Sequence, residues 1–251
     1  MVFLRRNIEG GIVYEIDFTA LDSVSDLGEG AITIDGVTWY SWNNGGANKT
    51  QIVNGSGIRL YGNGSAGSNQ TSSILGMDIG QLFGGVTYST GFEVWVDVAN
   101  SGGPISGWGT FAVRAIGIDN IPSTDSNNIN MCPVLPYFGW NQSANGLRYY
   151  EGLTTNGGTI ITSNSSTLAQ TSPSTWVLRG AGTGFQAYYG TPATAPDWPD
   201  KSSLTLLGSR TTGVTRTYPN TLFGPRFWGS IDNTVYLEIR RMRILRVWSG
   251  D

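Results

Sequence analysis

Histidine is absent from the 251-residue chain, and cysteine occurs once, at Cys132. Without histidine the chain cannot build a Ser-His-Asp or Cys-His catalytic site, and it lacks the commonest ligand of catalytic zinc. A single cysteine cannot form an intrachain disulfide, so a disulfide-stapled secreted module is excluded. These two shortages remove several classes of enzyme and metal site.

Charged residues are also scarce, at 13% of the chain, and the formal net charge is −3. Nucleic-acid binders normally carry a basic excess, so we expect no nucleic-acid partner. No run of 18 apolar residues occurs, so no membrane span is predicted. The first residues lack the apolar stretch of a secretory signal. We therefore expect either a mature form or a protein that does not use the general secretory route.

The chain is instead rich in small polar residues. Its 36 glycines, 24 serines, 26 threonines and 18 asparagines make up 104 residues. A helical bundle would need alanine, glutamate, lysine and leucine in quantity, which this composition excludes. The 12% aromatic content excludes a generic disordered chain. The composition favours a β protein whose surface is hydrated by hydroxyls and amides.

Alternation with a period of two predicts many short strands. In Ile12–Phe18, Tyr14 and Ile16 face one way while Glu15 and Asp17 face the other. In Gly91–Val98, Phe92, Val94, Val96 and Val98 form one face, and Glu93, Trp95 and Asp97 form the other. Further strands are predicted at 31–40 (a hairpin around Asp35-Gly36), 57–61, 110–118, 134–140, 146–150, 158–163, 175–180, 184–189, 203–208, 221–228 and 234–247.

Helix signals are poor. Residues 72–83 could hold one or two helical turns, although Gly76 and Gly80 weaken them. The polar stretch 119–130 is interpreted as an insertion between strands. Short strands at this spacing predict an all-β fold, an antiparallel β-sandwich or jelly roll. We expect residues 1–11 to form an N-terminal arm and residues 12–251 to form one sandwich domain.

The order of elements resembles the concanavalin A-like (laminin G-like) jelly rolls, particularly those of tail and capsid-associated proteins of tailed bacteriophages. The residues that carry the resemblance are 53–60, 92–98, 176–179, 185–190 and the closing stretch 229–247. The resemblance implies a non-enzymatic virion protein that decorates the capsid or forms part of a tail fibre. Its implied partners are other virion proteins and its own copies, with a trimer favoured, and its implied location is the surface of the phage particle.

Paired carboxylates are the first candidate for chemistry, because the same sandwich hosts glycoside hydrolases. Glu93 and Asp97 share a strand face but stand roughly 13 Å apart at the strand rise. That separation exceeds what either hydrolytic mechanism uses. The Glu-x-Asp-x-x-Glu signature of hydrolases with this fold is missing. Glu15 and Asp17 are better interpreted as the solvent face of an N-terminal strand. We therefore expect no enzyme activity.

Tryptophans are the second candidate, since a flat indole can stack on a sugar ring while its N–H donates a hydrogen bond. Trp95, between Glu93 and Asp97, is the most suggestive, so these three residues form the predicted glycan-binding set. A filled core or a subunit interface is the more frequent role of any one tryptophan. The other tryptophans considered are Trp39, Trp42, Trp108, Trp140, Trp198, Trp228 and Trp248.

No metal-binding loop motif occurs, and no cofactor is expected. Asp119 and Asp125, in a loop that also holds asparagines, are weak candidates for Ca²⁺ ligands. Such loops more often form Asx turns. No metal site is therefore predicted, with Ca²⁺ kept as the open alternative.

The remaining candidates concern interfaces. Arginine is favoured at protein interfaces, where its planar group pairs with carboxylates. Arg241 and Arg243 share one strand face, and the N-terminal arm is apolar enough to need a partner. The predicted interface residues are Phe3, Leu4, Arg5, Arg6, Ile8, Arg241 and Arg243.

Two functions from different classes remain. The first is the virion role, in which the arm docks on a neighbouring subunit and the sandwich projects outward. The alternative is a carbohydrate-binding lectin, or a glycan-cleaving enzyme, that uses the face of Trp95 on a host-surface glycan. The two roles are compatible, because a virion protein can also hold a glycan weakly.

Overall fold

The computed structural model describes residues 12–43, 49–61, 71–78, 91–100, 110–117, 136–141, 146–152, 160–165, 173–181, 184–211, 221–228 and 236–247. The predicted N-terminal arm, the loop with Asp119 and Asp125, and the single cysteine lie outside these residues. The division into an arm and one domain therefore stays a prediction.

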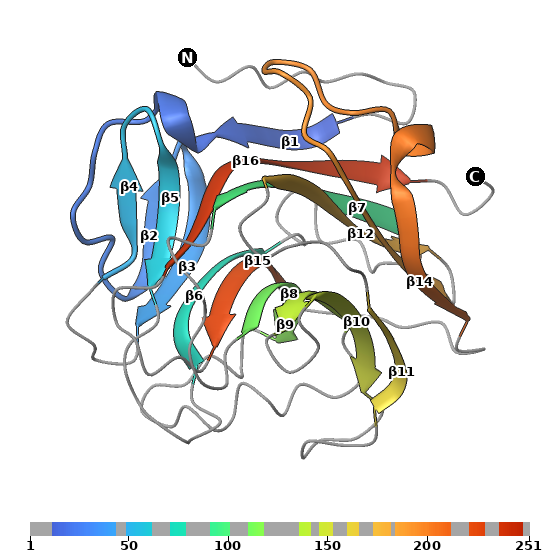
Figure 1. Ribbon diagram of the computed structural model, residues 1–251. Helices are drawn as coiled ribbons and strands as arrows, with labels where there is room; N and C mark the ends of the chain where they lie inside the picture. Colours follow the sequence, from blue (N-terminus) through green and yellow to red (C-terminus); the bar gives the residue numbers. More distant parts are fainter. Residues whose placement is uncertain are drawn as a thin grey trace.

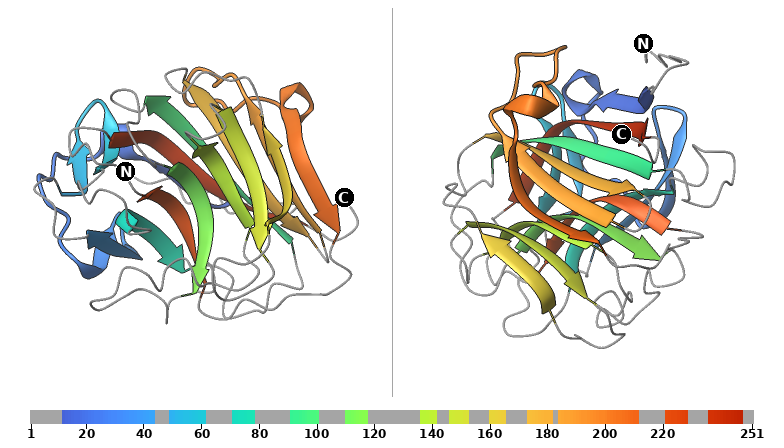
Figure 2. Two further views of the ribbon diagram at one scale, coloured as in Figure 1. Left: turned by 60° about the horizontal axis from the view of Figure 1, so that its bottom comes forward. Right: turned by 90° about the vertical axis from the view of Figure 1, so that its right-hand side faces the viewer.

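Two antiparallel sheets of eight strands each face one another as two layers (Figures 1 and 2). The first, called sheet A here, is centred on β7 (Gly91–Asn100) and β16 (Tyr236–Val247). Beyond β7 follow β12 (Ser174–Ala181), β13 (Gly184–Gly190) and β14 (Thr205–Thr211). Beyond β16 follow β5 (Gly57–Tyr61) and β4 (Gln51–Val53), and β1 (Ile12–Asp17) also pairs with β16.

The second layer, sheet B, has a separate strand order. It runs β11 (Ile160–Ser165), β10 (Gly146–Gly152), β9 (Pro136–Asn141), β8 (Thr110–Gly117), β15 (Thr221–Trp228), β6 (Thr71–Asp78), β3 (Val37–Asn43) and β2 (Gly30–Ile34). Two short 3-10 turns, Phe18–Ala20 and Lys201–Ser203, are the helical elements among the described residues. No helix in the described part of the chain is long and apolar enough to span a bilayer.

The core lies between the two sheets and is built from the inward residues of the alternating strands. Val94, Val96 and Val98 of β7 are at most 4% exposed and belong to one buried apolar cluster. Trp39 of β3 lies in the same cluster, with edge-on contacts to Tyr14 and Phe18. The predicted inner face of 92–98 is confirmed.

β16 changes its partner along one edge. Its residues 236–239 pair with β5, and its residues 241–245 pair with β1. The registers with β7 shift on both sides of Ile239, and Arg240 is exposed at this irregularity. As a result, Leu237 and Ile239 before it, and Met242 and Ile244 after it, all belong to the core. A bulge thus places Arg241 and Arg243 on the opposite face of sheet A.

Most strands lie within two residues of their predicted ends, and the all-β antiparallel sandwich is confirmed. The hairpin turn has Asp35 and Gly36 at φ 53° and 75°, the left-handed conformation that Asp-Gly turns favour. The helical turns considered for 72–83 are wrong where the structure describes them, because residues 71–78 form β6 between β15 and β3. Sheet pairing on both edges outweighed the local pattern there.

Candidate functional site

The predicted glycan-binding set lies on the outer face of sheet A, the face turned away from sheet B. Strand pairing aligns one row of residues across five strands: Tyr188, Val177, Trp95, Arg243 and Glu15. A second row aligns Thr175, Asp97, Arg241 and Asp17. The structure therefore brings Glu93, Trp95 and Asp97 together with the two predicted interface arginines, Arg241 and Arg243.

Residues 191–204, called the covering segment here, lie over this face. In Figure 1 the orange segment that links β13 to β14 arches over the side of sheet A that faces away from sheet B. Its Trp198 meets the ring of Trp95 edge-on, with 6.1 Å between the ring centroids. The Arg241 side chain donates to the carbonyl of Ala193 at 3.2 Å. The segment is thereby fastened to the sheet at several points.

Glu93 is bound by three donors of its own chain. Its carboxylate accepts from the indole N–H of Trp95 at 2.9 Å and pairs with Arg179 at 3.4 Å and with Lys201 of the covering segment. Lys201 also lies 5.3 Å from the ring of Tyr188. Only 4% of Glu93 is exposed. In the folded chain the Glu93 carboxylate therefore fixes the covering segment to the sheet through Lys201.

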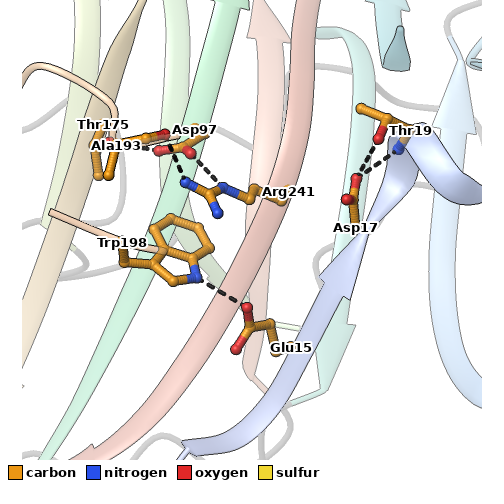
Figure 3. Close-up of polar contacts among 8 residues, drawn as sticks. All are labelled: Glu15, Asp17, Thr19, Asp97, Thr175, Ala193, Trp198 and Arg241. Atoms are coloured by element: carbon orange, nitrogen blue, oxygen red, sulfur yellow. Dashed lines mark hydrogen bonds and ion pairs between the residues drawn. The ribbon is translucent and has the colours of Figure 1, made fainter. Parts of the chain in front are cut away.

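Asp97 is equally engaged (Figure 3). It accepts from the Thr175 hydroxyl and from Nε of Arg241, and both Asp97 and Arg241 are 4% exposed. A buried carboxylate needs such partners, because an unpaired buried charge is costly. The carboxylate oxygens of Glu93 and Asp97 are all engaged by groups of the chain itself. The two carboxylates therefore do not form an acid–base pair for hydrolysis.

Trp95 is 2% exposed, because the covering segment lies on it. A sugar could stack on this ring only if the covering segment moved. The partly exposed tryptophan of this face is Trp198, whose N–H donates to Glu15 at 2.9 Å (Figure 3). The glycan-binding role of Glu93, Trp95 and Asp97 stays a prediction, and Trp198 is the indole nearer to solvent.

Two arginines stack on these indoles. The guanidinium of Arg241 lies 4.3 Å from the centre of Trp198. The guanidinium of Arg243 lies 4.1 Å from the centre of Trp95 and 4.7 Å from that of Trp198. Burial lowers the pKa of Arg243 to about 10, although the nearby carboxylates of Glu15 and Glu93 act in the opposite direction. Arg243 therefore remains protonated at neutral pH.

The other predicted sites have different outcomes. Arg241 directs its guanidinium at Asp97 in its own chain. The arm residues Phe3 to Ile8 and the Ca²⁺ candidates Asp119 and Asp125 lie outside the described residues. Among the residues that the structure describes, no group of three or more acidic, cysteine or histidine side chains is arranged to hold a metal.

Sequence reasoning included Trp198 among many tryptophans but gave it no special place. The Ala-Pro-Asp-Trp-Pro-Asp stretch indicates a loop, because its prolines disfavour regular strands. Its contact with Glu15, at the other end of the chain, depends on β1 and β16 pairing side by side. No local pattern reports that pairing.

Comparisons with solved structures identify sandwich domains of the legume-lectin-like type. The carbohydrate recognition domain of Emp47p aligns with 90% of this chain and 95% of its own, at 13% identity and a TM-score of 0.55. The exoplasmic/lumenal domain of VIP36, in a form bound to Ca²⁺ and Man3GlcNAc, covers 83% of both chains, at 11% identity and a TM-score of 0.51. A legume lectin-like domain from Entamoeba histolytica covers 82% of this chain and 88% of its own, at 7% identity and a TM-score of 0.51.

These identities are low, so the likeness concerns the fold. No protein-family model matches the sequence, and no curated protein does. The concanavalin A-like part of the predicted resemblance is thus confirmed at the level of architecture. None of these three neighbours is a phage protein. The virion role, the trimer and the location on a particle stay predictions.

Proposed function

We propose that this chain is a carbohydrate-binding domain without enzyme activity. The observation that carries the proposal is the sandwich itself, which aligns over most of its length with domains that recognise carbohydrates. Because a shared fold does not transfer a function, the proposal also needs a site with suitable chemistry. The outer face of sheet A offers one.

The proposed site is the surface around Trp198. An indole held in place by Glu15 and backed by two arginines is a rigid platform for a sugar ring. Glu15 and Arg243 flank it with an acceptor and a donor for sugar hydroxyls. Trp95 supports this platform from the side of the sheet, since it contacts both Trp198 and Arg243. In this arrangement Glu93 and Asp97 hold the platform and do not touch the sugar.

A glycan array probed with the full chain tests the proposal. We expect binding to at least one oligosaccharide, competition by the same sugar free in solution, and no release of new reducing ends. Trp198→Ala should abolish the binding. Tyr236→Ala is the matched control, because Tyr236, in β16 of sheet A, is likewise a partly exposed aromatic residue that stacks with an arginine, Arg59. Failure of the wild-type chain to bind any glycan would refute the proposal.

Calcium has no part in the proposed site, because its donors are an indole, a guanidinium and a single carboxylate. Binding should therefore persist after treatment with EDTA. Loss of binding on chelation, restored by Ca²⁺, would place the glycan at a metal site in another part of the chain and contradict the assignment to Trp198.

The virion location is tested separately, by quantitative mass spectrometry of purified phage particles from the source of the chain. A copy number that matches a capsid or tail symmetry would support it, and absence from particles would exclude it. Deletion of residues 1–11 should leave a folded sandwich that no longer joins the particle. Undiminished incorporation would contradict the docking role of the arm.

A further inference from the structure

Arg243 differs from the other basic side chains of the outer face of sheet A. The ion pairs found among the described residues join Arg59 with Glu238, Arg179 and Lys201 with Glu93, and Arg241 with Asp97. Arg243 takes part in none of them. Its Nε is buried and has no hydrogen-bond partner. Its guanidinium stacks on the two indole rings, those of Trp95 and Trp198.

Each carboxylate near Arg243 already takes part in another hydrogen bond or ion pair. Glu93 and Asp97 are engaged by the cations named above. Asp17 accepts from the backbone N–H and the hydroxyl of Thr19. Glu15, directly opposite Arg243 in the strand register, accepts from Trp198. The guanidinium is therefore half-buried and positively charged, and the carboxylates of Glu15, Glu93 and Asp97 attract it without forming an ion pair with it.

A guanidinium in this state fits one class of ligand. Its planar donors match a carboxylate or a sulfate, which can take two parallel hydrogen bonds. The side chain is partly exposed, so a ligand can reach it from solvent. Packing against two indoles restrains it in one orientation, which lowers the entropy lost when a ligand binds. A neutral sugar would leave the guanidinium without an ion-pair partner.

We infer that Arg243 is the anchor for an acidic glycan, one that carries a carboxylate or a sulfate group on the sugar that packs at Trp198. The inference rests on the proposed function and specifies its ligand. The acidic group bonds to Arg243, the ring packs against Trp198, and Glu15 accepts from a hydroxyl of the same sugar. Because Glu15 would repel a second negative group, a single acidic substituent is preferred at this position.

The test compares carboxylated, sulfated and neutral oligosaccharides on the array, followed by calorimetry with the tightest binder. The same oligosaccharide with its carboxyl group methyl-esterified, or its sulfate removed, is the matched ligand. Arg243→Gln should weaken binding of the acidic form at least tenfold, as expected for the loss of a charge-assisted pair. Arg240→Gln removes the same charge from the same strand at an exposed position, and it should bind like the wild type.

Each outcome decides the inference. Preference for the acidic ligand, lost in Arg243→Gln and kept in Arg240→Gln, supports it, and the array shows whether carboxylate or sulfate is taken. Binding of neutral glycans alone overturns it and leaves the proposed function standing. Equal binding by Arg243→Gln, shown to be folded by circular dichroism, also overturns it. Absence of all glycan binding overturns both proposals.

Three measurements keep the test valid if Arg243→Gln does not fold. The comparison of acidic and esterified ligands uses only the wild-type chain. Arg243→Lys keeps the charge but loses the planar pair of donors, so its affinity should fall between those of the wild type and Arg243→Gln. Ligand binding should also change the tryptophan emission of the wild type, and this change should diminish in Trp198→Phe.

Discussion

Replacing Asp97 by asparagine tests whether the outer face of sheet A is held by its ion pairs. Asp97 lies in β7, in the middle of sheet A, and its carboxylate accepts from Thr175 and Arg241. Asparagine keeps the size of the side chain and removes its charge. The guanidinium of Arg241 would then remain buried with the Ala193 carbonyl and a neutral amide as its acceptors.

The expected loss is large. Both partners are 4% exposed, so water cannot replace the missing charge. Leaving one member of a buried ion pair without its counterion costs about 3–5 kcal/mol. For a domain of this size, each kcal/mol lowers the Tm by about 2–4 °C, so Asp97→Asn should melt about 6–20 °C below the wild type. Such a loss is a substantial part of the stability of a typical domain, about 5–15 kcal/mol.

Urea unfolding followed by circular dichroism measures the loss, in a double-mutant cycle with Arg241→Met. The double variant should be less destabilised than the two single changes summed, because it leaves no buried charge. Glu238→Gln is the matched control in the same sheet. Its partner Arg59 has a side chain that is 25% exposed, so the expected cost is about 1 kcal/mol or less. Equal losses for Asp97→Asn and Glu238→Gln would refute the reasoning.

Three other predictions follow from single positions. Gly57 has φ 139°, and a Cβ there would lie 2.4 Å from the carbonyl oxygen of Ile239, so Gly57→Ala should lower the free energy of unfolding by about 1–3 kcal/mol. Gly55→Ala, at φ 77° with open space around it, should lower it by less. Similar shifts in Tm for the two variants would contradict this. Burial raises the pKa of Tyr14, so the side chain stays neutral in the fold at pH values where a tyrosine of the unfolded chain, with a pKa of about 10, ionises. The wild type therefore loses stability as the pH rises through that value. Tyr14→Phe should gain stability relative to the wild type between about pH 9 and 11, and parallel pH curves from urea unfolding would exclude the effect. Trp198→Ala should loosen the covering segment, so that trypsin cuts faster after Lys201; an unchanged rate, measured by mass spectrometry, would show that Trp198 does not hold the segment.

The fold was predictable because strand patterns are local. Gly91–Val98 alternates apolar and polar residues, and both faces come out as predicted. β4 is not predictable from the sequence, since three residues give no periodic signal. Residues 72–83 carry a weak pattern of helical turns, and the evidence that 71–78 form a strand lies in β15 and β3, far away in sequence.

The site was only partly predictable, for a different reason. Glu93, Trp95 and Asp97 stand on one face because a strand has a period of two, which the sequence shows. Whether that face meets solvent depends on residues 191–204, whose path is set by contacts with Glu15, Glu93 and Arg241. An alternation pattern reports which way a side chain points but not what lies above it. The partly exposed tryptophan of the site, Trp198, could therefore be identified only from the fold.

The central position of β16 in sheet A has a consequence for how the protein is made. The chain's last described strand is the direct neighbour of β1, β5 and β7, and Ile12 pairs with Leu245 almost the full chain length away. During synthesis these earlier strands leave the ribosome without the partner that joins them, so sheet A cannot close until residue 247 has emerged. Completion of sheet A must then wait for residue 247, and its unpaired edges are open to wrong strands or to chaperones in the interval.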